Sequence, residues 1–168
     1  ATAIRAFEEP TIDGKLDDDV WKTASSIFEF FQVEPQELSA PSEKTIAKFL
    51  YDDESIYISF ECFDSFPEKI EKPMVRRDNW FYGFGDQSDW VGISIDSKNN
   101  DYDGYFFALN AAGAKMDVSV SGHMQFDRSW DAVWSSGINI NENGWTAEFE
   151  IPFAVFQFKN SKDVVWGI

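Results

Sequence analysis

Hydrophobic and polar residues alternate along several short segments of this chain, which is the pattern of half-buried β-strands. The clearest case is the pair of segments 90–95 and 104–110. Apolar residues occupy every second position there, at Val91, Ile93, Ile95, Tyr105, Phe107 and Leu109. Between them stand smaller, mixed or polar residues, namely Trp90, Gly92, Ser94, Phe106, Ala108 and Asn110. Successive side chains of a strand point to opposite faces, so we expect an antiparallel pair with one buried face and one open face.

Other segments carry the same signal at regular spacing. We expect strands over 27–33, 45–51, 55–63, 116–120, 131–140 and 144–153. Short helical turns are expected at 17–21 and 152–156, and segment 69–85, which has no period, is predicted to be a long lining loop. About nine short strands with one or two helical turns predict an all-β fold, an antiparallel β-sandwich of immunoglobulin-like or jelly-roll-like two-sheet architecture.

Length and composition fit one domain over residues 1–168. The chain has 43% hydrophobic residues and seven tryptophans, which excludes a disordered protein. Its formal net charge of -16 argues against nucleic acid and an anionic membrane surface, because both attract Lys/Arg patches. A neutral ligand, a cation or a basic partner is compatible with this charge. Cys62 is the single cysteine, so an internal disulfide is excluded, and no apolar run reaches the length of a membrane span.

Several motifs follow one another along the chain. They are Ile12-Asp13-Gly14, Asp19-Val20-Trp21, the hairpin 51–58, Asp89 to Asp96, Gly104 to Asn110, Trp130 to Trp134, and Gly144-Trp145 with Glu148 to Phe153. Together they resemble the carbohydrate-binding module family 9-like domains over nearly the whole chain. The resemblance implies a β-sandwich that binds the end of a glycan on one sheet face, often with structural calcium.

Two of these motifs resemble one branch of the family more closely. Arg76-Arg77-Asp78 and the string from Trp130 to Trp134 are similar to the N-terminal module of a bacterial outer-membrane-associated family of unknown function. This closer resemblance implies an exported protein that is periplasmic, outer-membrane-associated or secreted. It also implies that the chain is the N-terminal part of a longer protein, with another domain after Ile168.

The chain departs from the family at its sugar-binding positions. The resemblance implies an acidic residue three positions after Asp89, where this chain has Gly92. It implies an arginine two positions before Asn110, where this chain has Ala108. The asparagine itself matches. Alternation places Gly92, Ala108 and Asn110 on one face of the strand pair, so they would belong to one site that has lost two polar groups.

Sugar binding needs flat aromatic side chains for the apolar face of a pyranose and planar polar groups for its hydroxyls. The candidates are Trp80, Trp90, Asn110, Arg77, Asp78 and Trp130, with Phe81 and Tyr82 as further aromatics of the lining loop. Arg77 and Asp78 could form paired hydrogen bonds with a sugar. The alternative is that each tryptophan covers the core or a sheet edge, which we expect of Trp21, Trp145 and Trp166.

The turn between the two clearest strands is a candidate calcium site. Calcium takes about six to eight oxygen ligands from carboxylates, amides and carbonyls. Oxygens of this kind come from Asp96, Asn99, Asp101 and Asp103. Their spacing differs from that of a helix-loop-helix calcium site, and the alternative is a solvated acidic turn.

Three functions from different classes follow from these observations. The first is a non-catalytic module that binds a xylan- or cellulose-type glycan or an oligosaccharide end in carbohydrate catabolism, with any glycoside hydrolase activity in another domain. The second is a structural or docking domain of an outer-membrane protein with an eroded sugar site. The third is a haem-carrying electron-transfer subunit with Met116 or Met124 as thioether ligand. His123 is the only histidine and no hydrolase or nucleotide-binding fingerprint follows a predicted strand, so an enzyme is not expected.

Overall fold

The computed structural model describes residues 1–80, 84–85, 87–122, 125–158 and 165–168. The chain divides into two compact units, each built from two stretches of sequence. Unit 1 comprises Ala1–Ile70 and Ser135–Ile151, and unit 2 comprises Glu71–Trp134 and Pro152–Ile168. Each unit contains one β-sheet.

The sheet of unit 1 has five strands in the order β1-β2-β3-β9-β8. Their bounds are Ile4–Arg5 for β1, Thr45–Tyr51 for β2, Ser55–Phe63 for β3, Ser135–Asn141 for β8 and Gly144–Pro152 for β9. Strand β1 pairs with β2 in parallel, whereas β2 with β3 and β8 with β9 form antiparallel hairpins. Two 3₁₀ turns, η1 (Asp19–Thr23) and η2 (Pro67–Lys69), belong to the same unit.

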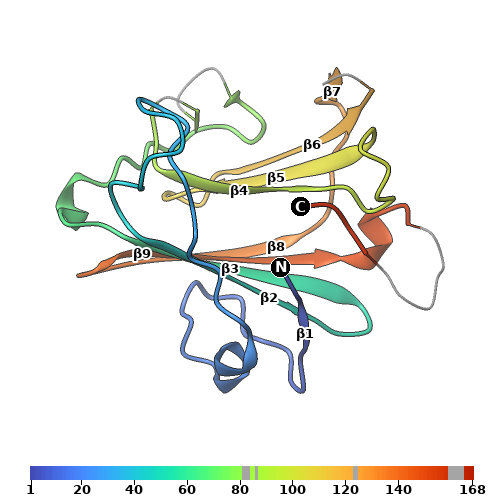
Figure 1. Cartoon of the computed structure of the whole chain (residues 1–168), viewed down its shortest axis with the longest axis horizontal. Helices are drawn as coiled ribbons and strands as arrows, with labels where there is room; N and C mark the ends of the chain where they lie inside the picture. Colours follow the sequence, from blue (N-terminus) through green and yellow to red (C-terminus); the bar gives the residue numbers. More distant parts are fainter. Residues whose placement is uncertain (81–83, 86, 123–124, 159–164) are drawn as a thin grey trace. The chain divides into compact units, whose positions relative to one another are not determined.

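The sheet of unit 2 has four antiparallel strands in the order β4-β5-β6-β7, which follow one another across the sheet as they do along the chain (Figure 1). Their bounds are Trp90–Ile95 for β4, Gly104–Asn110 for β5, Lys115–Ser121 for β6 and Gln125–Asp127 for β7. The 3₁₀ turn η4 (Phe153–Val155) also lies in this unit. None of the helical turns in the described residues is long or apolar enough to cross a membrane.

The all-β prediction is confirmed, and the hairpin 45–63 forms with the predicted bounds. The predicted strand 27–33 is wrong. Only Ile27 pairs with a strand, through one isolated bridge to Ala47. Past Ile27 the segment has no described pairing with a strand. Its backbone instead bonds within the loop that follows, where the Gln32 N–H donates to the Ser39 carbonyl. As a result Phe28, Phe31 and Val33 are 58%, 65% and 79% exposed.

The predicted strand 131–140 starts later than expected. Strand β8 begins at Ser135, and the four residues before it have no regular structure. Ala132 and Trp134 instead donate hydrogen bonds from the backbone and the indole to the Asp117 side chain. A strand over Ala132 would give up the first of these bonds, because its N–H would pair with a neighbouring strand instead.

A buried carboxylate joins the N-terminal segment to the sheet of unit 1. Glu148 of β9 is fully buried and accepts hydrogen bonds from the Gly14 N–H at 2.7 Å and the Trp21 indole at 2.9 Å. The neighbouring Thr146 hydroxyl donates to the Gly14 carbonyl. Burial raises the pKa of Glu148 to about 7, although both donors act in the opposite direction. The N-terminal segment thereby covers the second face of the sheet, where Trp21, Val20 and Ala24 pack with Leu50 and Tyr57.

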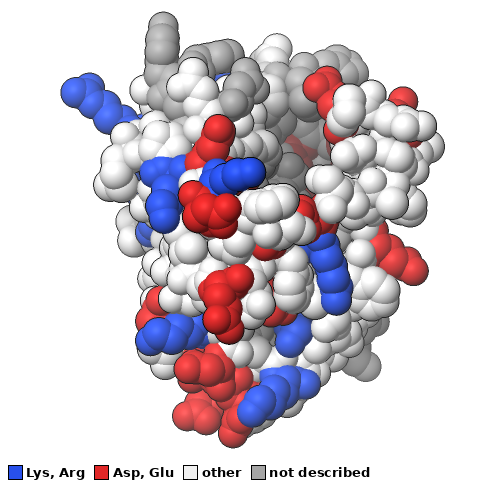
Figure 2. Space-filling view, turned by 90° about the vertical axis from the view of Figure 1, so that its left-hand side faces the viewer, with Lys and Arg blue, Asp and Glu red and all other residues white. Residues whose placement is uncertain are grey.

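Acidic and basic side chains stand next to each other on the surface, as the face in Figure 2 shows. Arg5 lies 2.7 Å from the Asp53 carboxylate, and Lys15 lies 2.9 Å from Asp13. In unit 2 the Lys98 ammonium lies 3.0 Å from Asp103. Several basic residues are thus paired with local carboxylates.

The stability of the protein should fall as the pH rises through the range in which Glu148 titrates. Below its ordinary pKa of 4.5 the group is neutral in both folded and unfolded chains. Between 4.5 and about 7 it ionises only when unfolded, which favours unfolding, and above that range it is charged in both states. Urea denaturation at a series of pH values should show a loss of up to about 3 kcal/mol from this group. Glu148→Gln should remove this part of the dependence of stability on pH, whereas Glu150→Gln, on the same strand, should keep it. Equal pH dependence in the wild type and both variants would contradict the assignment of this effect to Glu148.

Gly14 should not tolerate a side chain, because its backbone has a positive φ and because the Ile138 backbone occupies the space next to it. At φ +89° a β-carbon on this residue would lie 2.3 Å from the Ile138 carbonyl carbon. Gly113 has a similar φ of +83° and nothing within 4 Å of its β-carbon position. Gly113→Ala should therefore cost about 1 kcal/mol from backbone strain. Gly14→Ala should cost about 3 kcal/mol or more in urea denaturation. Similar losses in the two variants would show that Gly14 does not need its close contact with Ile138.

Candidate functional site

The site lies on the sheet of unit 2, on the face that the alternation predicts to be open. The paired residues on this face of β4 and β5 are Trp90 with Asn110, Gly92 with Ala108, and Ser94 with Phe106. Strand β6 extends the face with Met116, Val118 and Val120. Directly paired residues of an antiparallel ladder point to the same side. On the other side Val91, Ile93 and Phe107 are buried, as predicted, but Ala108, Asn110, Met116 and Val118 on the face predicted to be open are buried as well.

Four aromatic rings cover one end of this face. They belong to Trp80, Phe84, Trp90 and Phe106. The Trp80 ring centroid lies 5.0 Å from that of Trp90 and 5.9 Å from that of Phe84. The Trp90 indole donates to the Gly85 carbonyl at 3.1 Å. Phe84 is fully buried in a cluster that includes Ala108, so the predicted open face is closed at this end.

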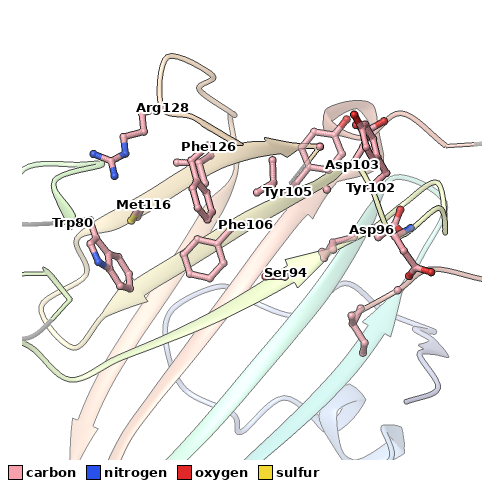
Figure 3. A pocket seen from close by; sticks show the side chains of 18 of the residues that line it. Trp80, Ser94, Asp96, Tyr102, Asp103, Tyr105, Phe106, Met116, Phe126 and Arg128 are labelled. Carbon is pink, nitrogen blue, oxygen red and sulfur yellow. The ribbon is translucent and has the colours of Figure 1, made fainter. Parts of the chain in front are cut away.

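Beside this aromatic cluster a pocket of about 790 Å³ opens on the same face (Figure 3). Its apolar lining comes from strands β5 to β7, with Phe106, Met116, Val118, Val120 and Phe126. Trp80 and Arg128 lie at one end of the pocket (Figure 3). Asp96, Tyr102 and Asp103, from the β4–β5 turn, lie at the other. Its volume falls within the range of about 300–1,000 Å³ that is usual for ligand pockets.

The pocket brings together only some of the predicted site residues. Trp80 and Trp90 line it, as do Asp96, Asp101 and Asp103 of the acidic turn. Five other predicted residues are not among those that line it: Arg77, Asp78, Asn110, Trp130 and Asn99. Phe81, Tyr82, His123 and Met124 lie outside the described residues.

Asn110 uses its amide within the protein. Its Oδ1 accepts hydrogen bonds from the N–H groups of Ala112 and Ala114 at 3.1 and 2.8 Å. Its Nδ2 donates to the Pro73 carbonyl at 3.1 Å, and the residue is fully buried. The asparagine that matches the family therefore holds the β5–β6 turn and the preceding loop in place. Contact of Asn110 with a sugar stays a prediction, and this geometry offers it no support.

Arg77 and Asp78 are also engaged inside the protein. The Arg77 guanidinium donates to the fully buried Asp117 carboxylate and to the Ala132 carbonyl, and lies 2.7 Å from the Asp131 carboxylate. Asp78 accepts the Asp117 N–H at 2.9 Å. Burial raises the pKa of the Asp78 carboxyl above its ordinary value. These contacts join the loop before β4, strand β6 and the segment before β8, so the arrangement favours a structural role over paired hydrogen bonds to a sugar.

Trp130 and Met116 lie in packed surroundings. The Trp130 ring centroid is 5.0 Å from that of Tyr105 and 5.9 Å from that of Phe107. Met116 is buried against the same cluster as Phe84. Sugar contact by Trp130 and haem ligation by Met116 stay predictions.

The acidic turn is closed by hydrogen bonds among its own groups. The Asp96 carboxylate accepts the N–H groups of Lys98, Asn100 and Asp101 at 2.7 to 3.0 Å. The Lys98 ammonium donates to Asp103 at 3.0 Å, and this bond holds the pKa of the Asp103 carboxyl below its ordinary value. Among the described residues, no group of three or more Asp, Glu, His or Cys side chains is placed to hold a metal ion. The arrangement fits calcium poorly, because Lys98 already supplies positive charge there; calcium stays a prediction.

Sequence reasoning missed several residues that line the pocket. Met116, Val118 and Val120 alternate along β6 and could have been placed on the open face by the same period-two argument. Phe126 and Arg128 lie in and after the three-residue strand β7, which is too short for a pattern to reveal. The contribution of the turn residue Tyr102 depends on how the β4–β5 turn folds, and the sequence carries no signal for this.

Comparisons with known proteins connect this geometry to a family. Residues 12–168 match the family described as carbohydrate family 9 binding domain-like. No curated protein matches the chain in sequence. A family 9 carbohydrate-binding module from Caldicellulosiruptor kristjanssonii in complex with glucose is similar in structure, with a TM-score of 0.64, 17% identity, and coverage of 99% of this chain and 75% of that one.

Two further solved structures are similar. A family 9 module from C. kristjanssonii in complex with cellotriose has a TM-score of 0.59 and 18% identity, covering 90% of this chain and 67% of that one. A putative carbohydrate-binding protein from Bacteroides uniformis has a TM-score of 0.65 and 9% identity, covering 92% and 72%. Identities this low establish the fold alone, which is the predicted β-sandwich.

Asp117 should be the residue on which the contacts around Arg77 depend. Asp117→Asn removes the charge and one acceptor oxygen from a site with several donors, and should cost about 2–4 kcal/mol in urea denaturation. Asp131→Asn changes a 69% exposed partner of the same arginine and should cost less than about 0.5 kcal/mol. Equal losses in the two variants would mean that burial of Asp117 does not set the strength of these contacts.

Proposed function

The chain belongs to the carbohydrate family 9 binding domain-like family, and we propose that it binds a xylan- or cellulose-type glycan, or the end of an oligosaccharide, in the pocket on the β4–β7 sheet. The proposal is based on the pocket itself, which opens on one face of the β4–β7 sheet beside the rings of Trp80, Trp90 and Phe106. Aromatic faces pack against the apolar side of a pyranose, and nearby polar groups can accept hydrogen bonds from its hydroxyls. The glucose and cellotriose found in similar structures support a ligand of this class.

In this proposal the chain is a non-catalytic module that serves carbohydrate catabolism, and any hydrolysis takes place in another domain. Its described pocket residues include carboxylates, but Asp96 and Asp103 are engaged in the hydrogen bonds of the turn. Xylan and cellulose are polymers outside the cell, so we place the protein's action there, as an exported protein.

A second candidate function is a structural or docking role, which the exposed apolar segment of unit 1 favours. Phe28, Phe31, Val33 and Leu38 all expose more than half of their surface there. Exposed apolar groups of this kind are typical of surfaces that contact another protein. The fully buried Asn110 and the apolar Gly92 and Ala108 agree with a sugar site that has been lost.

Sugar binding is tested directly by titration calorimetry with cellotriose and xylotriose. At least one sugar should bind, and Trp80→Ala and Phe126→Ala should weaken binding by about tenfold or more, which is about 1.4 kcal/mol. Phe28→Ala changes an exposed aromatic residue of unit 1 outside the pocket and should leave the affinity unchanged. Thermal unfolding of each variant shows whether the fold is intact. If neither these sugars nor a glycan array shows binding to the wild-type chain, sugar binding is wrong and the docking role is the better account.

A further inference from the structure

The pocket has an unequal distribution of polar groups. Apolar side chains from three strands form its wall, in which Met116 and Val118 are buried and Phe106, Val120 and Phe126 present accessible surface. Gly92 and Ala108, at the centre of the same sheet face, bring no polar group, and the Asn110 amide is used by Ala112, Ala114 and Pro73. A sugar hydroxyl placed on this surface would lose its hydrogen bonds to water and find no side-chain partner.

Polar groups gather instead at the ends of the pocket. Ser94, Asp101 and Tyr102 are exposed residues at the end formed by the β4–β5 turn. In Figure 3 this end is separated from the Trp80 end by the rings of Phe106 and Phe126. Carboxylates accept hydrogen bonds from neutral hydroxyls and repel anions, so this end suits a sugar and disfavours a fatty acid or another anionic amphiphile.

The apolar surface needs a ligand with an apolar part. Removing such surface from water is favourable in proportion to its area, and an aromatic ring on the ligand would meet the edges and faces of Trp80, Phe106 and Phe126. The volume of about 790 Å³ leaves room for a sugar together with a ring-sized substituent.

We propose that the preferred ligand is a neutral sugar that carries an apolar, aromatic substituent, with the substituent on the Phe106–Val120–Phe126 surface and the sugar hydroxyls at the β4–β5 turn. The inference rests on the proposed function, because it concerns the same pocket. It narrows the ligand class from glycans in general to aryl glycosides and aromatic esters of sugars, whose shared chemistry is a hydroxyl-rich ring joined to an aromatic ring.

The test compares ligands that differ only in the substituent. Binding of methyl β-glucoside, phenyl β-glucoside and phenol is measured by calorimetry, and binding of methyl and phenyl β-xyloside in the same way. Phenyl glycosides should bind about tenfold or more tightly than the methyl glycosides of the same sugar.

Val120→Thr, which is nearly isosteric but adds a hydroxyl to the pocket surface, should lower this phenyl-to-methyl ratio of affinities several-fold. Phe126→Ala, at a 49% exposed position where little loss of stability is expected, should do the same. Val133→Thr, at an 88% exposed valine outside the pocket, should leave the ratio unchanged.

The outcomes separate this inference from the proposed function. Equal affinity for methyl and phenyl glycosides would overturn the inference and leave sugar binding in place. Phenol binding as tightly as phenyl glycosides would overturn both, because the sugar would then contribute nothing. Absence of binding by every glycoside would also overturn both. A phenyl preference that survives Val120→Thr and Phe126→Ala unchanged would show that the aromatic group binds elsewhere, and would overturn the placement proposed here.

Discussion

The central strands of both sheets carry apolar residues on both faces, and each face needs a cover that keeps water out. In unit 1 every residue from Ser55 to Phe60 is buried. The second face of that strand is covered by the N-terminal segment, which Glu148 holds through Gly14 and Trp21. In unit 2 the cover is the loop with Trp80 and Phe84, and it extends over only part of the β4–β7 face. The pocket is the part of that face that this loop leaves open.

The same constraint explains why polar residues that look functional in the sequence form hydrogen bonds within the protein here. A loop that covers a sheet buries backbone N–H and C=O groups, and each of them needs a hydrogen-bond partner. Asn110 serves the β5–β6 turn and Pro73, and Asp117 serves Ala132 and the Trp134 indole. Arg77 balances the charge of Asp117, whose burial without a cation would be costly. The hydrogen-bonding groups of these side chains are therefore already used within the protein.

A structural feature can be predicted from the sequence when a local pattern determines it, and not when contacts between distant segments determine it. The hairpins and the two faces of β4 and β5 were predictable, because strict alternation has only one structural interpretation when both strands have a partner. The segment 27–33 is also rich in apolar residues, on both faces of an extended chain, but no neighbouring strand pairs with it beyond Ile27, and its sequence cannot reveal a missing partner. Glu148 stands at a polar position of its strand, and only the fold of the N-terminal segment makes that position buried. The pocket depends on turn geometry and on side chains from four strands, which no local pattern contains.

The apolar character of the pocket is connected with the glycine at position 92, where the family resemblance implies an acidic residue. A β-carbon at Gly92 would lie 3.0 Å from the Phe106 ring and 3.1 Å from the Phe107 carbonyl oxygen. An acidic side chain at this position would therefore require the Phe106 ring to shift, and with it the edge contact between that ring and Trp90. A larger side chain at Ala108 would meet the buried Phe84 in the same cluster. A polar side chain at either position would require the aromatic cover to shift, so the chemistry of a ligand on this face is set by aromatic and aliphatic side chains, with hydrogen bonding at the ends of the pocket.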